Sequence, residues 1–520
     1  MMKELPKPDR RTFKVLLIYP YNTTRESDIR WYPTEPLGVL YVASYLSEQA
    51  QRQGLPVQIK ILDAQLEGPA QCVATARGFR NGMTDEQIRA CVATFEPDVV
   101  GISMNYTFGV QDVFDIAAIV KQAVPPTTRL VIGGAHATLD HRKVAEHPMV
   151  DVVVRGEGEV TFQELCHAFY HQEDIGNIAG ITYRAKDTIK INPNREPIDD
   201  LDTLPIPDRS LLPYASYLSK HHYFHTMQSP VGTIFSARGC PFHCIFCSTQ
   251  KTWGNAWRGR SAGNILKEVE YLRNQFGVRE IAFQDDQFLG DRQRIIDFCK
   301  LVVEKKLGMT FIVPPGNSPC FMNDELLDWM ARAGFYRICF SVDVGTEAAV
   351  RYVGKPVRLA SVRALVKAAN HRGIWTYGTF VIGFPYEDKA AIQATVAYAY
   401  GLKLDFLRFY IAQPYFGSEL YDYYEKAGRL TGIKVNEQHS NNDAFFGTDH
   451  MSATELIDLR NQAELNYIRH HGADFFSPTY VATEFLPKIA SFRKLSYFLG
   501  LAFRFVAIRL KFKWEFLRGF

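Results

Sequence analysis

Long apolar runs and an excess of one charge sign are both missing from this chain of 520 residues. Its 59 Lys and Arg nearly balance 56 Asp and Glu, which leaves a net charge of +3. The composition therefore supplies no electrostatic argument for nucleic acid as a partner. No run of about eighteen uncharged apolar residues occurs, and the opening residues MMKELPKPDRR lack the apolar core of a secretion signal. We expect a cytoplasmic protein without a nucleic-acid partner.

Cysteine is also scarce, with nine residues in the chain. An odd total without an even-numbered framework argues against a disulfide-stapled scaffold. Six cysteines lie singly among apolar neighbours, which predicts reduced, buried thiols that behave as small hydrophobes: Cys72, Cys91, Cys166, Cys299, Cys320 and Cys339. The other three lie close together and need a separate explanation.

Short apolar runs alternate with amphipathic stretches between residues 14 and 170. Helices are expected over 37–49, over 84–95 with Thr84 as N-cap, and over 110–123. The alternation predicts an α/β fold, a doubly wound parallel sheet whose ligands bind at the carboxyl ends of the strands. We assign residues 1–172 to this Rossmann-like domain. Its expected strands, uniformly apolar as buried parallel strands are, cover residues 14–20, 57–62, 98–104, 129–134 and 151–156.

A proline-rich connector is expected over residues 173–230, and it contains a predicted hairpin, GITYRAKDTIKINP. Strand–helix units then resume over 231–430, with apolar strands starting near residues 231, 281, 310, 336, 375 and 406. This spacing predicts a partial (β/α) barrel, whose chemistry gathers at the carboxyl ends of its strands. Residues 431–520 are predicted to be mostly helical.

The stretch SARGCPFHCIFCSTQ, residues 236–250, holds Cys240, Cys244 and Cys247 in a CxxxCxxC spacing. A structural zinc site takes four ligands, so zinc would need a further one, and His243 is the nearest candidate. A 4Fe–4S cluster can instead be held by three cysteines, which leaves one iron open to a small molecule. Chance clustering of core cysteines is the third reading, disfavoured because polar, glycine-containing loops are poor places for buried thiols.

The spacing, with Phe246 directly before the third cysteine, resembles the motif of the radical S-adenosylmethionine superfamily. Other stretches look like landmarks of the subfamily that carries an N-terminal cobalamin-binding domain: VVRGEGEVTFQEL (153–165), LDTLPIPDR (201–209), GTFVIGFP (378–385) and AQPYFGSELY (412–421). The resemblance spans about residues 14–430. It implies that the three cysteines hold a 4Fe–4S cluster, whose open iron binds S-adenosylmethionine and cleaves it to a 5′-deoxyadenosyl radical.

The same resemblance implies where S-adenosylmethionine binds. Phe246 would pack near the adenine, and strand-end segments that contain Asp343 and Gly383 would line the pocket. The family often has glutamate in the pattern SxExG, where this chain has Asp343, one methylene shorter. For Asp285 and Asp286, a solvated loop pair and a ligand-facing pair both stay open.

Cobalamin-binding domains that ligate cobalt from below use DxHxxG after a strand of such a sheet. Here the corresponding stretch is Asp63-Ala-Gln65-Leu-Glu-Gly68, so glutamine replaces the histidine. Because an amide is a far poorer ligand for a transition metal than imidazole, we predict bound cobalamin without a protein histidine on cobalt. Loss of cobalamin is the alternative. Besides Gln65 and Gly68, the cofactor-binding residues expected at strand ends are Ser103, Gly133, Gly134, His136, Gly156, Glu157 and Gly158, with His136 as a hydrogen-bonding residue.

A radical generator and a cobalt cofactor in one chain, as the resemblance implies, favour C-methylation of an unactivated carbon in a small-molecule or lipid-like substrate. Other members of the subfamily form or contract rings or carry out oxidations, so a cyclase or oxidase without methyl transfer stays open. A non-catalytic cobalamin or iron–sulfur sensor is disfavoured, because a sensor has little use for a complete S-adenosylmethionine pocket. The family also implies a reducing partner such as flavodoxin or ferredoxin.

The last stretch, residues 492–520, interleaves aromatic and aliphatic residues with Lys and Arg and contains one acid, Glu515. Such a stretch can lie on an anionic membrane surface, which would make the protein membrane-associated and bring the barrel to a lipid-like substrate. It can equally be a helix that packs its apolar side on the barrel and leaves its cations in water. Both readings stay open.

Overall fold

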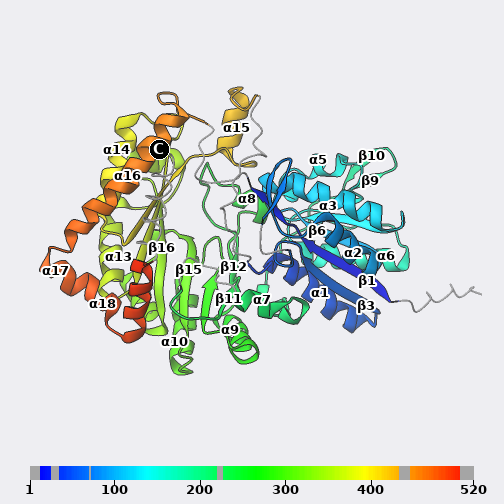
Figure 1. Ribbon diagram of the computed structural model, residues 1–520, viewed down its shortest axis with the longest axis horizontal. Coiled ribbons are helices and arrows are strands. Elements are labelled where there is room, and N and C mark those ends of the chain that lie inside the picture. Colours follow the sequence, from blue (N-terminus) through cyan, green and yellow to red (C-terminus); the bar gives the residue numbers. More distant parts are fainter. Residues whose placement is uncertain (1–11, 25–33, 69–71, 220–225, 432–445, 504–520) are drawn as a thin grey trace, which may run out of the picture. The chain divides into compact units, whose positions relative to one another are not determined.

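The computed structural model describes residues 12–24, 34–68, 72–219, 226–431 and 446–503. The chain divides into two compact units, whose elements are labelled in Figure 1. Unit 1 comprises Met1–Tyr217, Cys247–Arg258 and Pro414–Ser440, and unit 2 comprises Leu218–Phe246, Gly259–Gln413 and Asn441–Phe520. Each unit contains a large sheet of mainly or wholly parallel strands, which confirms the predicted α/β architecture.

The sheet of unit 1 has seven strands in the order β10-β9-β8-β7-β6-β1-β3. The predicted hairpin forms β9 (Ile181–Ala185) and β10 (Thr188–Ile191), and β9 pairs antiparallel with β8, so the hairpin extends this sheet. The parallel strands match the predicted apolar runs and are β1 (Phe13–Tyr19), β3 (Val57–Asp63), β6 (Val99–Ser103), β7 (Arg129–Gly133) and β8 (Val152–Val154).

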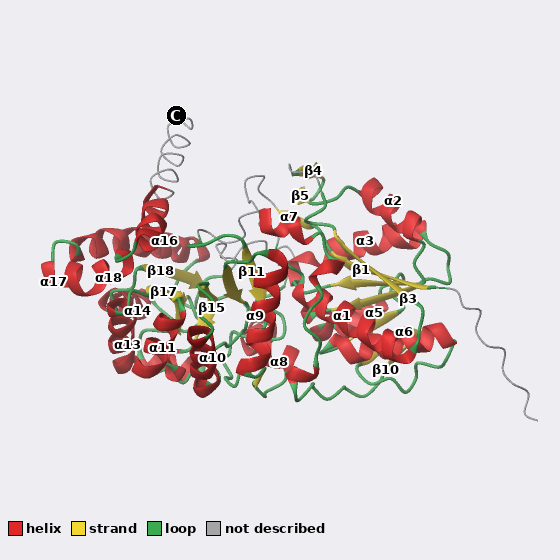
Figure 2. Cartoon of the chain, turned by 90° about the horizontal axis from the view of Figure 1, so that it is seen from below, coloured by secondary structure: helices red, strands yellow, loops and turns green. Residues whose placement is uncertain are grey.

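Helices cover both faces of this sheet (Figure 2). On one face α1 (Leu37–Gln53) packs against α6 (Gly158–His171), and on the other α2 (Asp85–Phe95) packs against α3 (Val110–Ala123). The predicted N-cap is confirmed, because the Thr84 hydroxyl accepts the amide N–H of Gln87 at 3.3 Å. Helices on both faces leave the strand ends as the open edges of the sheet.

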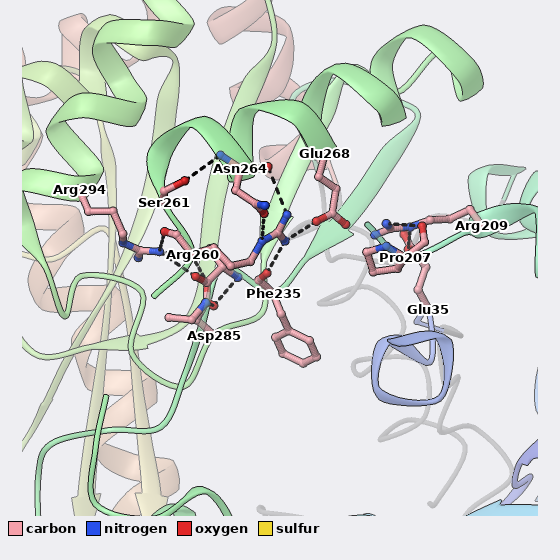
Figure 3. Close-up of polar contacts among 12 residues, drawn as sticks. Glu35, Pro207, Arg209, Phe235, Arg260, Ser261, Asn264, Glu268, Asp285 and Arg294 are labelled. Carbon is pink, nitrogen blue, oxygen red and sulfur yellow. Dashed lines mark hydrogen bonds and ion pairs between the residues drawn. The ribbon is translucent and has the colours of Figure 1, made fainter. Parts of the chain in front are cut away.

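A buried ion pair fastens the proline-rich segment to unit 1 (Figure 3). Arg209, at the start of the 3₁₀ turn η3 (Arg209–Leu211), is fully buried, and its Nε donates to Glu35 Oε2 at 3.2 Å. Tyr214, the first residue of α7 (Tyr214–Ser219), donates its hydroxyl to the other oxygen of Glu35 at 2.9 Å. Both carboxylate oxygens are therefore used, as a buried charge requires.

Unit 2 is built on six parallel strands that follow one another in sequence order. The sheet is open between its first and last strands, and helices α9 to α14 lie between successive strands, so the predicted partial barrel is confirmed. The strands are β11 (Val231–Ile234), β14 (Glu280–Phe283), β15 (Thr310–Asn317), β16 (Phe335–Asp343), β17 (Trp375–Ile382) and β18 (Phe406–Ile411).

The C-terminal region is helical, as predicted. Helix α16 (Ala453–Asp474) packs against β18, and short helical turns lead to a final helix over residues 492–503. That helix covers the amino ends of the barrel strands with the buried ring of Tyr497, which lies 5.1 Å from the Tyr336 ring and 6.0 Å from the Trp375 ring. None of the helices described in this structure is long and apolar enough to cross a membrane.

The isolated cysteines divide into two groups. Cys166, Cys299 and Cys339 are buried as predicted, and burial raises the pKa of each thiol. The prediction was wrong for Cys320, which is exposed because the 3₁₀ turn η4 (Pro319–Phe321) carries it to the surface. Cys72 and Cys91 are only partly buried.

We predict that Tyr497→Ala lowers the free energy of unfolding of unit 2 by about 3–5 kcal/mol, since it removes a buried aromatic ring from the base of the barrel. Leu495→Ala, on the exposed side of the same helix, should change it by less than about 0.5 kcal/mol. Urea unfolding followed by tryptophan fluorescence measures both variants. Equal losses would contradict the assignment of the inner and outer faces.

Candidate active site

The cysteine loop begins where β11 ends, and a buried carboxylate holds its first residues (Figure 3). Asp285, which follows β14, accepts the backbone N–H groups of Ser236, at 2.6 Å, and of Ala237. It also accepts the Ser236 hydroxyl at 3.0 Å. Burial raises the pKa of Asp285 to about 6. The structure shows a role that neither hypothesis for Asp285 included, the solvated one or the ligand-facing one: this side chain positions the loop backbone.

Two buried arginines hold the carbonyl groups of the same turn (Figure 3). Arg260 donates to Phe235 O at 2.8 Å, and Arg294 donates to Ser236 O at 2.8 Å. Arg260 is in turn paired with Glu268 of α9 (Ala262–Phe276). With Asp285, these side chains satisfy both the N–H and the C=O groups at the start of the loop, which makes its entry rigid. We name Asp285, Arg260 and Arg294 the loop clamp.

The middle of the cysteine loop rests on the end of α12 (Glu347–Val353). Ile245 N–H donates to Val353 O at 3.1 Å. Gly354 has φ +74°, and a Cβ atom there would lie 3.0 Å from His243 O, so a side chain would be strained and crowded. This glycine therefore allows the two backbones to approach closely.

The three thiols differ in exposure. Cys240 and Cys244, in unit 2, are partly buried, whereas Cys247, in unit 1, is exposed and its Sγ donates to Thr249 Oγ1 at 3.2 Å. His243, the suggested further zinc ligand, is exposed. Within the described parts of the chain, no three Cys, His, Asp or Glu side chains gather closely enough to hold a single metal ion.

A buried ion pair lies at the carboxyl end of β16. Asp343, with φ +64°, binds the Lys355 ammonium and accepts the Ser341 hydroxyl at 2.8 Å. Lys355 directly follows Gly354, so it lies beside the residues of α12 and its C-terminal turn that contact the cysteine loop. Burial alone would lower the pKa of Lys355, but Asp343, and then Cys244 and Cys240, outweigh it and raise this pKa. Asp343, the carboxylate at the SxExG position, is thus already bound to Lys355.

The segment Gly383-Phe384-Pro385, which follows β17, packs against Phe246, the aromatic residue of the cysteine motif. The ring of Phe246 lies 6.0 Å from that of Phe384. Gly383 has φ +86°, and its N–H and that of Phe384 both donate to Glu387 Oε2, at 2.7 and 2.9 Å. Burial raises the pKa of Glu387 to about 7. Sequence reasoning missed Glu387, although its place four residues after a strand-end glycine was a usable signal.

In unit 1, the turn after β3 carries the glutamine that replaces the cobalt-ligating histidine. Asp63 accepts Gln65 N–H at 3.0 Å and Leu66 N–H at 2.9 Å, and the Tyr217 hydroxyl donates to its other oxygen. Burial raises the pKa of Asp63 to about 6. Gln65 Nε2 is buried and has no hydrogen-bond partner among the residues described. An unpaired buried amide is costly and indicates a missing acceptor.

The turns after β6 and β7 interlock. Ser103 and Gly133 are register partners at the ends of these strands. Gly134 has φ +113°, and a Cβ atom there would lie 2.6 Å from Asn105 Oδ1. His136 is buried, and its Nδ1 lies 3.1 Å from Thr107 Oγ1. Burial lowers the pKa of His136 to about 4, so the imidazole is neutral at pH 7 and hydrogen-bonded within the protein.

The RGEGE segment after β8 combines an open glycine with a buried carboxylate. Gly156, at φ +73°, has no atom near the position of a Cβ. Glu157 is paired with Arg258 at 2.6 Å and accepts Ile198 N–H at 2.7 Å, so this side chain holds together three segments of unit 1. A Cβ at Gly158 would lie 3.2 Å from Val42, which shows tight packing against α1.

These turns lie at the carboxyl ends of β3, β6, β7 and β8, which are at one edge of the parallel sheet, with β1 between β3 and β6. Its polar groups include the buried Gln65 amide nitrogen, which has no partner among the described residues, and the neutral imidazole of His136. Its backbone has glycines where a bulky flat ring could approach. At Gly68 a Cβ atom would lie 2.0 Å from the backbone of Gly82, so that glycine serves turn packing instead. The residue types at this edge suit a corrin, and three thiols on one loop are the kind of ligands that an iron–sulfur cluster takes.

Comparisons with known proteins agree with these two sites. The family model "B12 binding domain" matches residues 31–166, and "Radical SAM superfamily" matches residues 234–399. Cytidylyl-2-hydroxyethylphosphonate methyltransferase from Streptomyces wedmorensis is 30% identical over 80% of this chain and 82% of its own length. An uncharacterized methyltransferase from Pyrococcus horikoshii is 29% identical over 88% and 93%. An anaerobic magnesium-protoporphyrin IX monomethyl ester cyclase from Rubrivivax gelatinosus is 25% identical over 86% and 75%.

Solved structures share the fold. The radical S-adenosylmethionine methyltransferase TsrM from Kitasatospora setae superposes with a TM-score of 0.66 at 17% identity, covering 81% of this chain and 79% of TsrM. The cobalamin-dependent S-adenosylmethionine radical enzyme OxsB gives 0.65 at 15% identity, over 94% and 72%. With both family models matched in this order, and a relative 30% identical over four fifths of its length, the chain belongs to the cobalamin-dependent radical S-adenosylmethionine enzymes.

Proposed function

We propose that this enzyme transfers a methyl group to an unactivated carbon of a small-molecule or lipid-like substrate. The observation that carries the proposal is its greater identity to two methyltransferases, 30% and 29%, than to the cyclase, 25%. All three relatives are covered over at least three quarters of their length, so the comparison concerns whole enzymes. Cyclisation or oxidation without methyl transfer is the competing function.

When bound, the iron–sulfur cluster and S-adenosylmethionine supply a hydrogen-abstracting radical, and cobalamin supplies the methyl group. In our proposal Cys240, Cys244 and Cys247 hold the cluster, and the loop clamp fixes the backbone that carries them. Rigid placement matters because a misplaced radical reacts with solvent or protein. A reducing partner such as flavodoxin or ferredoxin would supply the electron.

The strand ends of unit 2 would hold S-adenosylmethionine. Phe246 would offer aromatic surface for the adenine, supported by the buried ring of Phe384, and Gly383 takes the positive φ that the adjoining turn requires. Because Asp343 is bound to Lys355 and Ser341, we assign it the role of positioning this lysine beside the cysteine loop. Lys355 would then place a positive charge near Cys240 and Cys244.

The strand ends of unit 1 would hold cobalamin. Gln65 would offer its amide to the cofactor without ligating cobalt, and His136, already bonded to Thr107, would line the site without ligating it. Ser103 and Gly133 would line the site, Gly156 would let the backbone approach the corrin, and Gly134 would allow the close contact of its turn with Asn105. Glu157 would act through the backbone it positions, because its carboxylate is fully used.

Anaerobic reconstitution with iron, sulfide and cobalamin tests the function. We expect about four irons and about one corrin per chain, and both 5′-deoxyadenosine and S-adenosylhomocysteine when low-potential reductant, S-adenosylmethionine and a candidate substrate are supplied. S-adenosylhomocysteine records methyl donation, so its absence beside 5′-deoxyadenosine would transfer the assignment to a cyclase or oxidase. Zinc in place of iron, with no corrin, would overturn both.

The loop clamp generates a second prediction. Asp285→Ala should lose most of its reconstituted iron, because two buried N–H groups at the start of the loop lose their acceptor, at about 1–3 kcal/mol each. Asp286→Ala, at the exposed neighbouring position, is the matched control and should keep its iron. Iron analysis and the cluster absorbance measure the iron that each variant holds. Circular dichroism and the milder variant Asp285→Asn separate local disorder of the loop from global unfolding. Equal iron in both alanine variants would refute the clamp.

The absence of a protein ligand on cobalt is tested by electron paramagnetic resonance of the Co(II) form. Uniform nitrogen-15 labelling of the protein should leave the wild-type hyperfine pattern unchanged, because an amide is a poor ligand. Gln65→His should instead acquire a pattern that the label alters. Glu67→His, at an exposed position two residues on, is the control and should resemble the wild type. A label-sensitive wild-type spectrum would contradict the prediction.

A further inference from the structure

The final helix of unit 2 is apolar on both sides. Its inner side packs on the barrel through Tyr497 and Phe498, whose ring stacks 6.1 Å from that of Trp375. Its outer side carries large apolar residues three, four and four positions apart, which places them on one helical face. These residues and their exposed fractions are Phe492, 89%, Leu495, 38%, Leu499, 57%, and Phe503, 76%.

This stripe belongs to a larger apolar surface. Seven of the thirteen large hydrophobic side chains exposed in the described residues lie between residues 475 and 503. Besides the stripe they are Phe475, Phe476 and Leu486. The ring of Phe485 lies 5.0 Å from that of Phe475 and 5.2 Å from that of Phe498, which links Phe475 to the helix. We name these seven residues the C-terminal apolar surface. Scattered exposed hydrophobes are ordinary, whereas a concentration of this kind marks a docking surface.

A basic depression of about 690 Å³ lies beside Phe492. Among the described residues that line it there is no acidic side chain, but five basic ones: Lys306, Arg332, Arg372, Arg493 and Lys494. Arg332 and Arg372 are paired with carboxylates of α11 (Asp324–Ala333), and Lys494 donates to backbone carbonyls. Lys306 and Arg493 have no carboxylate partner in the described part of the chain, so they supply the charge available to an anion.

We propose that the C-terminal apolar surface and this basic depression dock unit 2 on an anionic lipid membrane, with the apolar stripe in the acyl boundary and the cations at the headgroups. Charge favours a membrane over a second copy of the chain, because a symmetric dimer would bring the same cations face to face. Residues 475–520 contain eight basic and two acidic residues, and Glu484, the acid among the described ones, is buried.

The docking surface lies at the edge of the unit 2 sheet opposite the candidate active site. The depression is lined by Thr310 and Phe335, which begin β15 and β16, whereas Asp343 and Gly383 follow the ends of β16 and β17. Membrane docking would therefore tether the enzyme through the edge of unit 2 that lies away from the candidate active site. The inference goes beyond the proposed function and does not depend on it.

Co-sedimentation of the full chain with vesicles tests the proposal. Wild-type protein should bind vesicles of phosphatidylcholine mixed with phosphatidylglycerol, more weakly at high salt, and should bind phosphatidylcholine alone far less. Leu495→Ser with Leu499→Ser should reduce partitioning about tenfold or more, since binding scales with inserted apolar area. Leu465→Ser with Ile468→Ser, at similarly exposed positions of α16, is the matched control and should partition like the wild type.

Lys306→Glu with Arg493→Glu should weaken binding to the anionic vesicles by about fivefold or more for each charge and flatten its salt dependence. Circular dichroism and the iron content of each variant confirm that the fold is retained. Failure of the wild type to bind anionic vesicles, or equal binding of the two serine pairs, would overturn the proposal. A dimer that Leu495→Ser with Leu499→Ser dissociates in light scattering would assign the surface to a second copy instead. None of these results bears on S-adenosylmethionine cleavage, so the two proposals fail separately.

Discussion

The site in unit 2 depends on the clamp at the end of β11. A loop that carries three thiols cannot hold itself, because a glycine-containing turn has few contacts of its own. Asp285 takes its N–H groups, and Arg260 and Arg294 take its carbonyl groups. All three side chains are buried, where a charge is tolerated only with full pairing. Because the side chains of the clamp are anchored in the stable barrel core, they hold the start of the cysteine loop in a fixed position.

The parallel sheet imposes the same geometric constraint on the candidate sites of both units. Parallel strands bring their carboxyl ends to one edge, so residues distant in sequence meet there. In unit 1 this edge collects Gln65, Gly134 and His136; in unit 2 it collects the cysteine loop and the segments after β16 and β17. Each edge contains a buried ion pair, Glu157 with Arg258 in unit 1 and Asp343 with Lys355 in unit 2.

The C-terminal helix shows how one element serves two requirements. Tyr497 completes the base of the barrel, which needs an apolar plug because the strands begin there with large rings. The stripe from Phe492 to Phe503 is not needed for that packing, since it faces outward. Basic residues around it resemble the composition of helices that lie at a lipid surface. Packing on the barrel uses one side of this helix, and the membrane contact that we propose would use the other.

Hydrophobic period and cysteine spacing determined much from the sequence alone: the strands of both sheets, the capped helix after Thr84, the cysteine motif and the family. These signals are local, because a strand or a cap is encoded within a few residues. Only the tertiary structure decided that Asp285 clamps the loop and that Glu387 binds the turn at Gly383. It also decided that Lys355 forms an ion pair with Asp343 and that Cys320 is exposed. Whether a carboxylate is buried, and what it meets there, depends on segments far away in the chain, and no short pattern records that.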